Sequence, residues 1–129
     1  YRTAPGHDPL IRDNEISSTS VGINVVADSA PVVEGNRLRD NATGILSSSD
    51  VSSFVDNELS GNDIGMQLSG SPTLDGNSIE DGRVGILMVG EGTQPEMKGN
   101  TVCGNEENVQ IADSTSASTL TYDDTNQVC

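Results

Sequence analysis

Apolar residues recur along the chain at fixed distances from a repeated Asn. An apolar residue stands three positions before each reference Asn, another stands two positions after it, and a Gly stands eight positions after it in four of the five copies. The reference residues are Asn14, Asn36, Asn57, Asn77 and Asn100, spaced by 22, 21, 20 and 23 residues. A repeat of this length is typical of a solenoid or an array of repeats.

Each repeat offers about four apolar positions that face one interior. Within a repeat they are spaced in twos, and Gly, Asn or Pro separates the groups, which predicts short β-strands and argues against helices. The predicted core columns are Ile11, Val33, Phe54, Leu74 and Met97; Ile16, Leu38, Leu59, Ile79 and Val102; Ile23, Ile45, Met66, Ile86 and Val109; and Val25, Ser47, Leu68, Met88 and Ile111.

Three short strands per repeat, with bends between them, predict a β-solenoid. The phrases APVVEGNRLRDNATGI, SPTLDGNSIEDGRVGI and QPEMKGNTVCGNEENV resemble the right-handed parallel β-helix of the pectate-lyase-like superfamily, over roughly residues 9 to 112. A right-handed sense also follows from the rule for parallel crossovers. We therefore expect an all-β fold, a right-handed parallel β-helix of about five to six coils with three short strands per coil.

The whole chain, residues 1–129, is predicted to form one domain. Residues 1–8 correspond by phase to part of a first coil, residues 9–112 to the regular coils, and residues 113–129 to a degenerate coil or cap. Terminal repeats are commonly atypical because they cover the core. The start in mid-coil predicts either further coils upstream or another segment that covers this end.

The repeated Asn column is predicted to be structural. Stacked amides hydrogen-bond to one another along a β-stack, so Asn14, Asn36, Asn57, Asn77 and Asn100 are expected to form a ladder at a tight bend.

The charge excludes several classes of partner. Twenty acidic residues against six basic ones give a net charge of −14, which argues against nucleic acid and against anionic membranes as partners. No segment is long enough and apolar enough to span a membrane as a helix. The acidic turns leave calcium open as a cofactor, because calcium prefers carboxylate and carbonyl oxygens. No other cofactor is predicted.

The few basic residues fall by phase next to acidic ones. Glu15, Arg37 and Glu58 share one outward column, and Arg39 is expected near Glu58. Arg12 is expected over Glu34, and Asp75 under Lys98. Such pairs are expected to maintain the strand register and to contribute little stability.

The sequence offers weak support for an enzyme. Lyases that this fold resembles use an unpaired basic residue beside a carboxylate cluster, and Arg83, next to Asp81, is the least paired candidate. His7 is the single histidine, which excludes a multi-histidine metal site. The Asp123–Asp124 pair is too common a dipeptide to indicate a hydrolase. No catalytic residue is assigned.

Ligand contacts, if present, must be mainly polar, because Phe54 belongs to the core and only Tyr1 and Tyr122 remain as aromatic platforms. The most expanded corner, Gly90–Gln94, is the predicted recognition edge. The predicted ligand-binding residues are Glu91, Thr93, Gln94, Arg83 and Asp81.

Cys103 and Cys129 are separated by about one coil, so they are placed either to form a disulfide that holds the C-terminal tail or to remain two free thiols. A disulfide would indicate an oxidising compartment, and we expect an extracellular or cell-surface location. The glycosylation sequon Asn41–Thr43 lies in a repeat column, and chance explains it.

Three functions remain. The first is a non-catalytic polysaccharide-binding or accessory module of a larger secreted protein, because the superfamily it resembles mostly handles polysaccharides. The second is a structural or protein-interaction solenoid, with neighbouring domains or coils of a parent protein as partners. The third is a fragment of a polysaccharide lyase, epimerase or hydrolase.

Overall fold

The computed structural model describes residues 3, 6, 8–49, 51–89, 95–111, 121–122 and 125–129, of which residues 121–122 are described by their backbone. This part of the chain contains strands and no helix. The strands are β1 (Leu10–Arg12), β2 (Glu15–Ser17), β3 (Val21–Val25), β4 (Val32–Glu34), β5 (Arg37–Arg39), β6 (Thr43–Ser47), β7 (Ser53–Val55), β8 (Glu58–Ser60), β9 (Ile64–Leu68), β10 (Thr73–Asp75), β11 (Ser78–Glu80), β12 (Val84–Met88), β13 (Glu96–Lys98), β14 (Thr101–Val102), β15 (Glu107–Ile111), β16 (Thr121–Tyr122) and β17 (Gln127–Val128).

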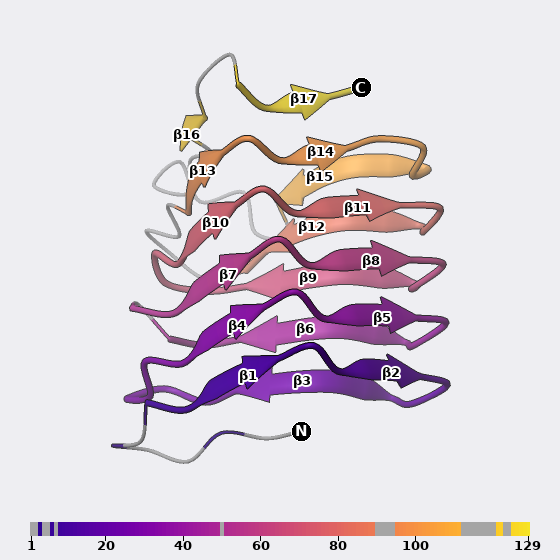
Figure 1. Cartoon of the computed structure of the whole chain (residues 1–129). Coiled ribbons are helices and arrows are strands. Elements are labelled where there is room, and N and C mark those ends of the chain that lie inside the picture. Colours follow the sequence, from indigo (N-terminus) through magenta and orange to yellow (C-terminus); the bar gives the residue numbers. More distant parts are fainter. Residues whose placement is uncertain are drawn as a thin grey trace.

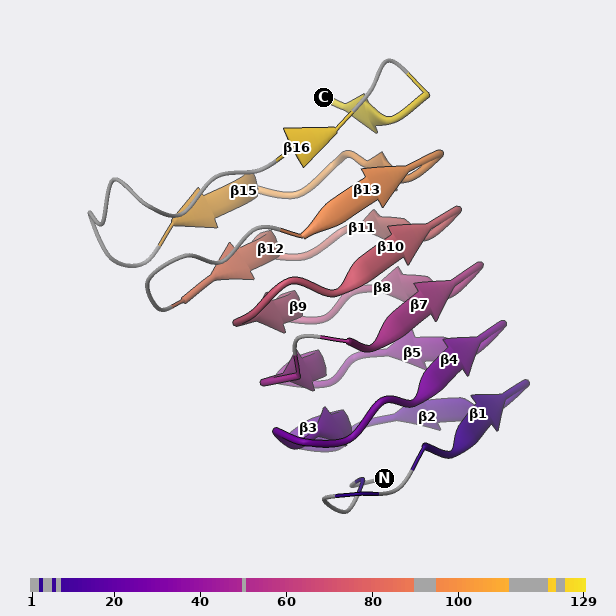
Figure 2. The same ribbon diagram turned by 90° about the vertical axis from the view of Figure 1, so that its left-hand side faces the viewer.

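The strands stack into three parallel sheets (Figures 1 and 2). The first sheet has the order β1-β4-β7-β10-β13-β16, the second β2-β5-β8-β11-β14-β17, and the third β3-β6-β9-β12-β15. Followed from β1 through β3 and up the stack, the chain winds with a right-handed sense. The predicted parallel β-helix with three strands per coil is therefore confirmed.

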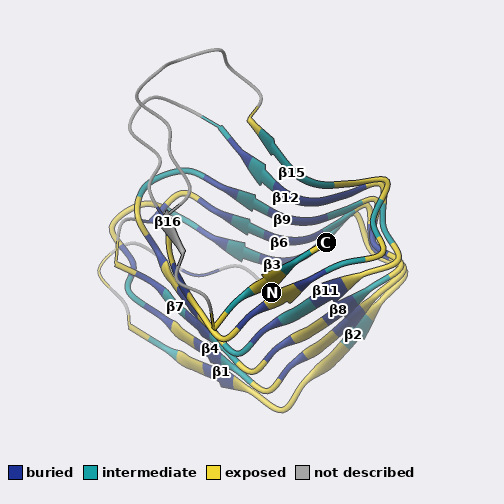
Figure 3. Cartoon of the chain, turned by 90° about the horizontal axis from the view of Figure 1, so that it is seen from above, coloured by how far each residue is buried: buried dark blue, intermediate teal, exposed yellow. Residues whose placement is uncertain are grey.

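The core is a column enclosed by the three sheets (Figure 3). The predicted apolar columns point inward, and the register pairs each of their members with its counterpart one coil away, as for Ile11 with Val33 and Ile23 with Ile45. The ends of the stack are less covered: Ile16 and Val109 are partly buried, and Ile111 is 46% exposed. Because each coil is covered by its neighbours, burial depends on position in the stack.

The turn before each ladder Asn requires a left-handed backbone. Its five positions carry only Asp or Gly, with φ values from 51° to 68°, at Asp13, Gly35, Asp56, Gly76 and Gly99. Glycine adopts this conformation without steric cost, and Asp tolerates it better than most residues. This local requirement explains why the residue before each of the five repeated Asn residues is either Asp or Gly.

The Asn column forms a continuous ladder. Asn57 is representative: its Oδ1 accepts bonds from the backbone N and from Nδ2 of Asn36, both at 3.0 Å, and its Nδ2 donates to Val33 O and to Asn77 Oδ1, both at 2.9 Å. The ladder extends to Asn126, whose Oδ1 accepts two bonds from Asn100 at 2.9 Å.

A second amide column follows five residues after the first and was not predicted. Asn41 is 3% exposed; its Nδ2 donates to Asn62 Oδ1 at 3.0 Å and to Ile16 O at 3.3 Å. Gly82 and Asn105 occupy the next two positions of the column, and Gly82 N donates to Asn105 Oδ1 at 2.9 Å. The sequon Asn is thus a buried structural residue, and this fold has no room for a glycan on it.

Partial coils lie at both ends of the described stack. Thr3 N donates to Asn24 O at 2.9 Å, which places Thr3 beneath the third sheet in the predicted phase. At the other end, β16 pairs with β13 and β17 pairs with β14. A disulfide joins Cys103 to Cys129, with their Cα atoms 4.9 Å apart, and both cysteines of the chain are thereby oxidised.

Replacing both cysteines by Ser is expected to lower the free energy of unfolding by about 3–4 kcal/mol, because the crosslink spans 26 residues and restricts the unfolded chain. Urea unfolding followed by circular dichroism measures the loss. A dithiol reductant should lower the midpoint of the unmodified chain by a similar amount and leave the double variant unchanged. Equal midpoints for the oxidised chain and the double variant would show that the bridge does not stabilise the fold.

Candidate functional site

The outward faces of the first and second sheets carry charged side chains. On the first sheet these are Arg12, Glu34, Asp75, Glu96 and Lys98; on the second they are Glu15, Arg37, Arg39, Glu58 and Glu80. The charges alternate in sign along parts of these columns, as the sequence predicted. Both faces are therefore rich in charge, although β1 and β4 of the first sheet also expose Leu10 and Val32.

The outward face of the third sheet differs, because from β3 to β12 it carries no charge. Inward residues alternate with outward ones along a strand, so the residue between two core positions points outward. We call the resulting surface the neutral face. Its central outward residues are Asn24, Leu46, Gln67 and Leu87, followed on β15 by Gln110. Partly buried Val21, Thr43 and Ile64 and exposed Glu107 flank them.

The strand register aligns the side chains of the neutral face into columns. Asn24 pairs with Leu46, Leu46 with Gln67, Gln67 with Leu87, and Leu87 with Gln110, so these five side chains form one column along the stack. All five are partly buried. A second column, of Val21, Thr43 and Ile64, borders the first; Val84, which follows in register, is fully buried.

The three amides on the neutral face contrast with those in the turns. The turn Asn side chains hydrogen-bond to neighbouring coils, whereas Asn24, Gln67 and Gln110 make no side-chain hydrogen bond to any described residue. An amide carries two donors and an acceptor. The neutral face thus offers hydrogen-bond donors and acceptors to an external ligand. These amide groups alternate with Leu side chains along the column.

The ion pairs correct part of the predicted charge pattern. Arg37 and Glu58 pair at 3.5 Å, as predicted. Arg39, which was expected near Glu58, lies opposite Ser60 on the strand that carries Glu58 and forms its ion pair with Glu15 of the preceding coil. The diagonal pairing occurs because the long Arg side chain reaches the neighbouring column.

Two further predicted pairs share register but form no ion pair. Arg12 lies opposite Glu34, but its Nε contacts Asp13 Oδ2 at 3.0 Å. That hydrogen bond, followed by the charges of Asp13 and Glu34, raises the pKa of Arg12. Asp75 and Lys98 are register neighbours without an ion pair.

Arg83, which the sequence indicated as the least paired basic residue, forms an ion pair. Its Nε lies 3.0 Å from Asp63 Oδ1, because the preceding coil places Asp63 beneath it at the corner before β12. The hydrogen bond to Asp63 is the main cause that raises the pKa of Arg83, and the charge of Asp63 adds to it. A guanidinium with a raised pKa remains protonated at neutral pH, so Arg83 lacks the properties of a proton-abstracting base.

Of the other predicted ligand residues, the structure describes Asp81 alone. Asp81 occupies a left-handed position with φ of 57° in the turn after β11, where it has a backbone role. Glu91, Thr93 and Gln94 lie outside the described residues, as do His7 and Asp123–Asp124.

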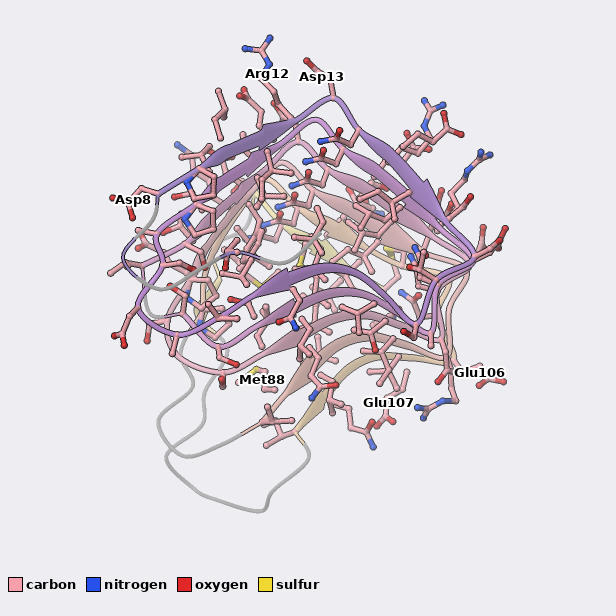
Figure 4. All side chains as sticks on the ribbon, turned by 90° about the horizontal axis from the view of Figure 1, so that it is seen from below. Asp8, Arg12, Asp13, Met88, Glu106 and Glu107 are labelled. Atoms are coloured by element: carbon pink, nitrogen blue, oxygen red, sulfur yellow. A yellow bond between two sulfur atoms is a disulfide. The ribbon has the colours of Figure 1, made fainter. Side chains whose placement is uncertain are left out.

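Two hollows occur near the N-terminal end of the stack. One of about 340 Å³ is lined by Leu10, Ile11, Arg12, Asn14 and Ile16, and lies where the first coil leaves the core partly open. The other, of about 220 Å³, is lined by Asp13, Asn14, Glu15, Gly35 and Arg37 on the outside of the first turn. Figure 4 views this end from below, with Arg12 and Asp13 pointing away from the core.

The chain matches one protein-family model over residues 4–128, that of "Periplasmic copper-binding protein (NosD)". The chain belongs to the NosD family. This family is part of the right-handed parallel β-helix superfamily, so the resemblance is confirmed at that level. No curated protein and no solved structure matches the chain. The described residues include no helix that could cross a membrane.

The residues that the structure describes do not fit a copper site of the kind the NosD description suggests. Both cysteine sulfurs form the disulfide, and the thioethers of Met66, Met88 and Met97 are buried inside the column. Among the described residues, no three His, Cys, Asp or Glu side chains group closely enough to hold a metal ion. The preferred soft ligands for copper are therefore inaccessible here.

Sequence reasoning missed three structural features, each of which had a signal. Residues of the neutral face stand between two inward positions, as Asn24 does between Ile23 and Val25. The second amide column keeps a constant offset of five from the first. Asn126 precedes an apolar Val128 at the same spacing as the other ladder residues.

Proposed function

We propose that this NosD-family chain is a non-catalytic accessory module that binds a neutral polysaccharide on the neutral face. The observation that carries the proposal is the absence of charge from β3 to β12 on that face, in a chain whose net charge is −14. A flat row of amide and apolar side chains suits an extended, uncharged chain, because sugar hydroxyls can hydrogen-bond to amides and ring C–H groups can contact Leu.

Affinity electrophoresis tests this function. The chain is run in gels that contain xylan, β-glucan, mannan, pectin or alginate, each with calcium and with chelator. We expect retardation by a neutral polysaccharide that does not depend on calcium. Retardation only by pectin or alginate, or only with calcium, would instead place the ligand on the acidic faces. No retardation in any gel would refute polysaccharide binding.

A charge placed on the neutral face should abolish retardation. Leu87→Glu introduces a carboxylate between Gln67 and Gln110. Thr73→Glu is the matched control, because Thr73 is exposed on the outward face of the first sheet. We expect Leu87→Glu to migrate as in a gel without polysaccharide and Thr73→Glu to stay retarded. Equal retardation of both variants would show that the ligand does not use the neutral face.

The second candidate is a protein-interaction solenoid. Apolar and amide residues without charges also suit the centre of a protein interface, where charged residues are depleted. The hollow of about 340 Å³ at the N-terminal end of the stack, lined in part by Ile11 and Ile16, supports neighbouring coils or domains as partners. Adding one upstream coil of the same repeat should raise the melting temperature if this end is normally covered.

We also propose a location outside the cytoplasm, at the cell surface or beyond it. The NosD family is periplasmic, and disulfides persist in oxidising compartments. Labelling of intact cells with a membrane-impermeant reagent tests this location.

A further inference from the structure

We infer that the neutral face selects a β-1,4-linked neutral polysaccharide that runs along the stack, with every second sugar bound by an amide. This inference rests on the proposed function and specifies its ligand. It starts from an alternation in the column: amides occupy the first, third and fifth coils at Asn24, Gln67 and Gln110, and Leu46 and Leu87 occupy the coils between them.

The spacing of the column is fixed by the backbone. Neighbouring parallel strands lie about 4.8 Å apart, so side chains two coils apart repeat every ~9.6 Å. In an extended β-1,4-linked chain, each sugar advances the chain by close to one strand spacing, and successive rings are turned over. Equivalent hydroxyls therefore reappear on the same side at every second sugar. The amide period and the ligand period then coincide along several coils.

The chemistry of each position agrees with this arrangement. The side chains of Asn24, Gln67 and Gln110 make no hydrogen bond within the described chain, so each can donate to and accept from a sugar hydroxyl without breaking an existing bond. Leu46 and Leu87 place apolar surface under the intervening rings. These side chains are partly buried, so binding immobilises little that is not already restricted.

Other glycans fit less well. A β-1,3-linked chain curves, and its hydroxyls do not stay aligned with a straight column of side chains. A uronan brings one negative charge per acidic sugar to a face that has no basic residue from β3 to β12. Like-charge repulsion from a chain of net charge −14 adds to that mismatch.

Isothermal titration with cellohexaose, mannohexaose, laminarihexaose and a galacturonate hexamer tests the inference on the whole chain. We expect at least one of the two β-1,4-linked neutral hexamers to bind at least tenfold more tightly than the β-1,3-linked laminarihexaose. The galacturonate hexamer should give no measurable heat. Tighter binding of laminarihexaose or of the uronate would overturn the inference while leaving polysaccharide binding intact.

Gln67→Leu tests the role of the central amide. This change keeps the strand and removes the donors and acceptor, so we expect at least a tenfold loss of affinity for the β-1,4-linked hexamer. Gln127→Leu is the matched control, because Gln127 is an exposed amide on the second sheet. The affinity of this variant for the β-1,4-linked hexamer should equal that of the parent chain. Urea midpoints equal to that of the parent chain establish that both variants fold.

The binding results distinguish a failure of the inferred amide contacts from a failure of the proposed polysaccharide binding. If Gln67→Leu binds as tightly as the parent chain, the amide register is wrong, although the chain still binds a polysaccharide. If no hexamer and no polymer binds, the proposed function itself fails.

Discussion

Replacing Asn57 by Ala is expected to lower the free energy of unfolding by about 3–5 kcal/mol. The change leaves the backbone N–H of Asn36 without its acceptor and Val33 O without a donor from Asn57. Asn36 Nδ2 loses one of its two acceptors and keeps Ile11 O. Each buried polar group that loses its partner costs about 1–3 kcal/mol. Asn36 and Asn57 are each 1% exposed, so water does not replace the lost bonds.

Asn14→Ala is the matched control in the same column. Asn14 is exposed at the end of the ladder, and its Nδ2 donates one bond to Asn36 Oδ1. Asn36 Oδ1 keeps the bond from the Asn14 backbone N at 3.0 Å. We expect a loss of about 1 kcal/mol or less. Chemical unfolding in urea measures both variants, and similar losses at the two sites would mean that the ladder bonds do not determine the stability.

Gly65→Ala is expected to destabilise the fold by about 3 kcal/mol or more, and the chain is expected to fold poorly. A Cβ at this position would lie 2.6 Å from Gly85 O in the next coil and 2.6 Å from Ile79 Cγ2. Backbone oxygen cannot move aside without breaking the register of β9 and β12. The close approach of successive coils, and not a left-handed φ, is the reason for this glycine column.

Gly104→Ala separates these two effects. Gly104 has φ of 70°, but the nearest atom to a new Cβ is Asp81 Oδ1 at 3.7 Å. The variant therefore bears only the cost of a left-handed non-glycine residue, about 1–2 kcal/mol. Thermal unfolding of both variants measures the difference. A larger loss for Gly104→Ala than for Gly65→Ala would contradict the steric explanation.

The sequence predicted the coils well because the same local requirements recur in every repeat. The inward columns, the Asn ladder and the left-handed turns each depend on residues at fixed offsets, so five copies reinforce one phase. Predictions about charge pairs were less accurate. Arg39 forms an ion pair with Glu15, and Arg83 forms one with Asp63. Long side chains can reach several acidic neighbours at similar energy, because each exposed ion pair contributes little stability.

The candidate site was harder to predict than the fold. The sequence pointed to the expanded corner at Gly90–Gln94, which lies outside the described residues. The neutral face, on which the proposed function rests, consists of three-residue alternations such as Ile23, Asn24 and Val25, which look ordinary in any one coil. Its property appears only when Asn24, Leu46 and Gln67 are aligned across coils, because strand pairing makes neighbours of residues more than 20 positions apart.

The sequence by itself determined the repeat, the inward columns, the ladder positions and the acidic character of this chain, because each depends on residue type at a local spacing. Tertiary structure alone decided which charges pair, how completely the end coils are covered, and which outward columns adjoin. The physical reason is that backbone conformation and inward packing are imposed locally in every coil. Surface contacts between coils depend instead on the register and on the reach of each side chain.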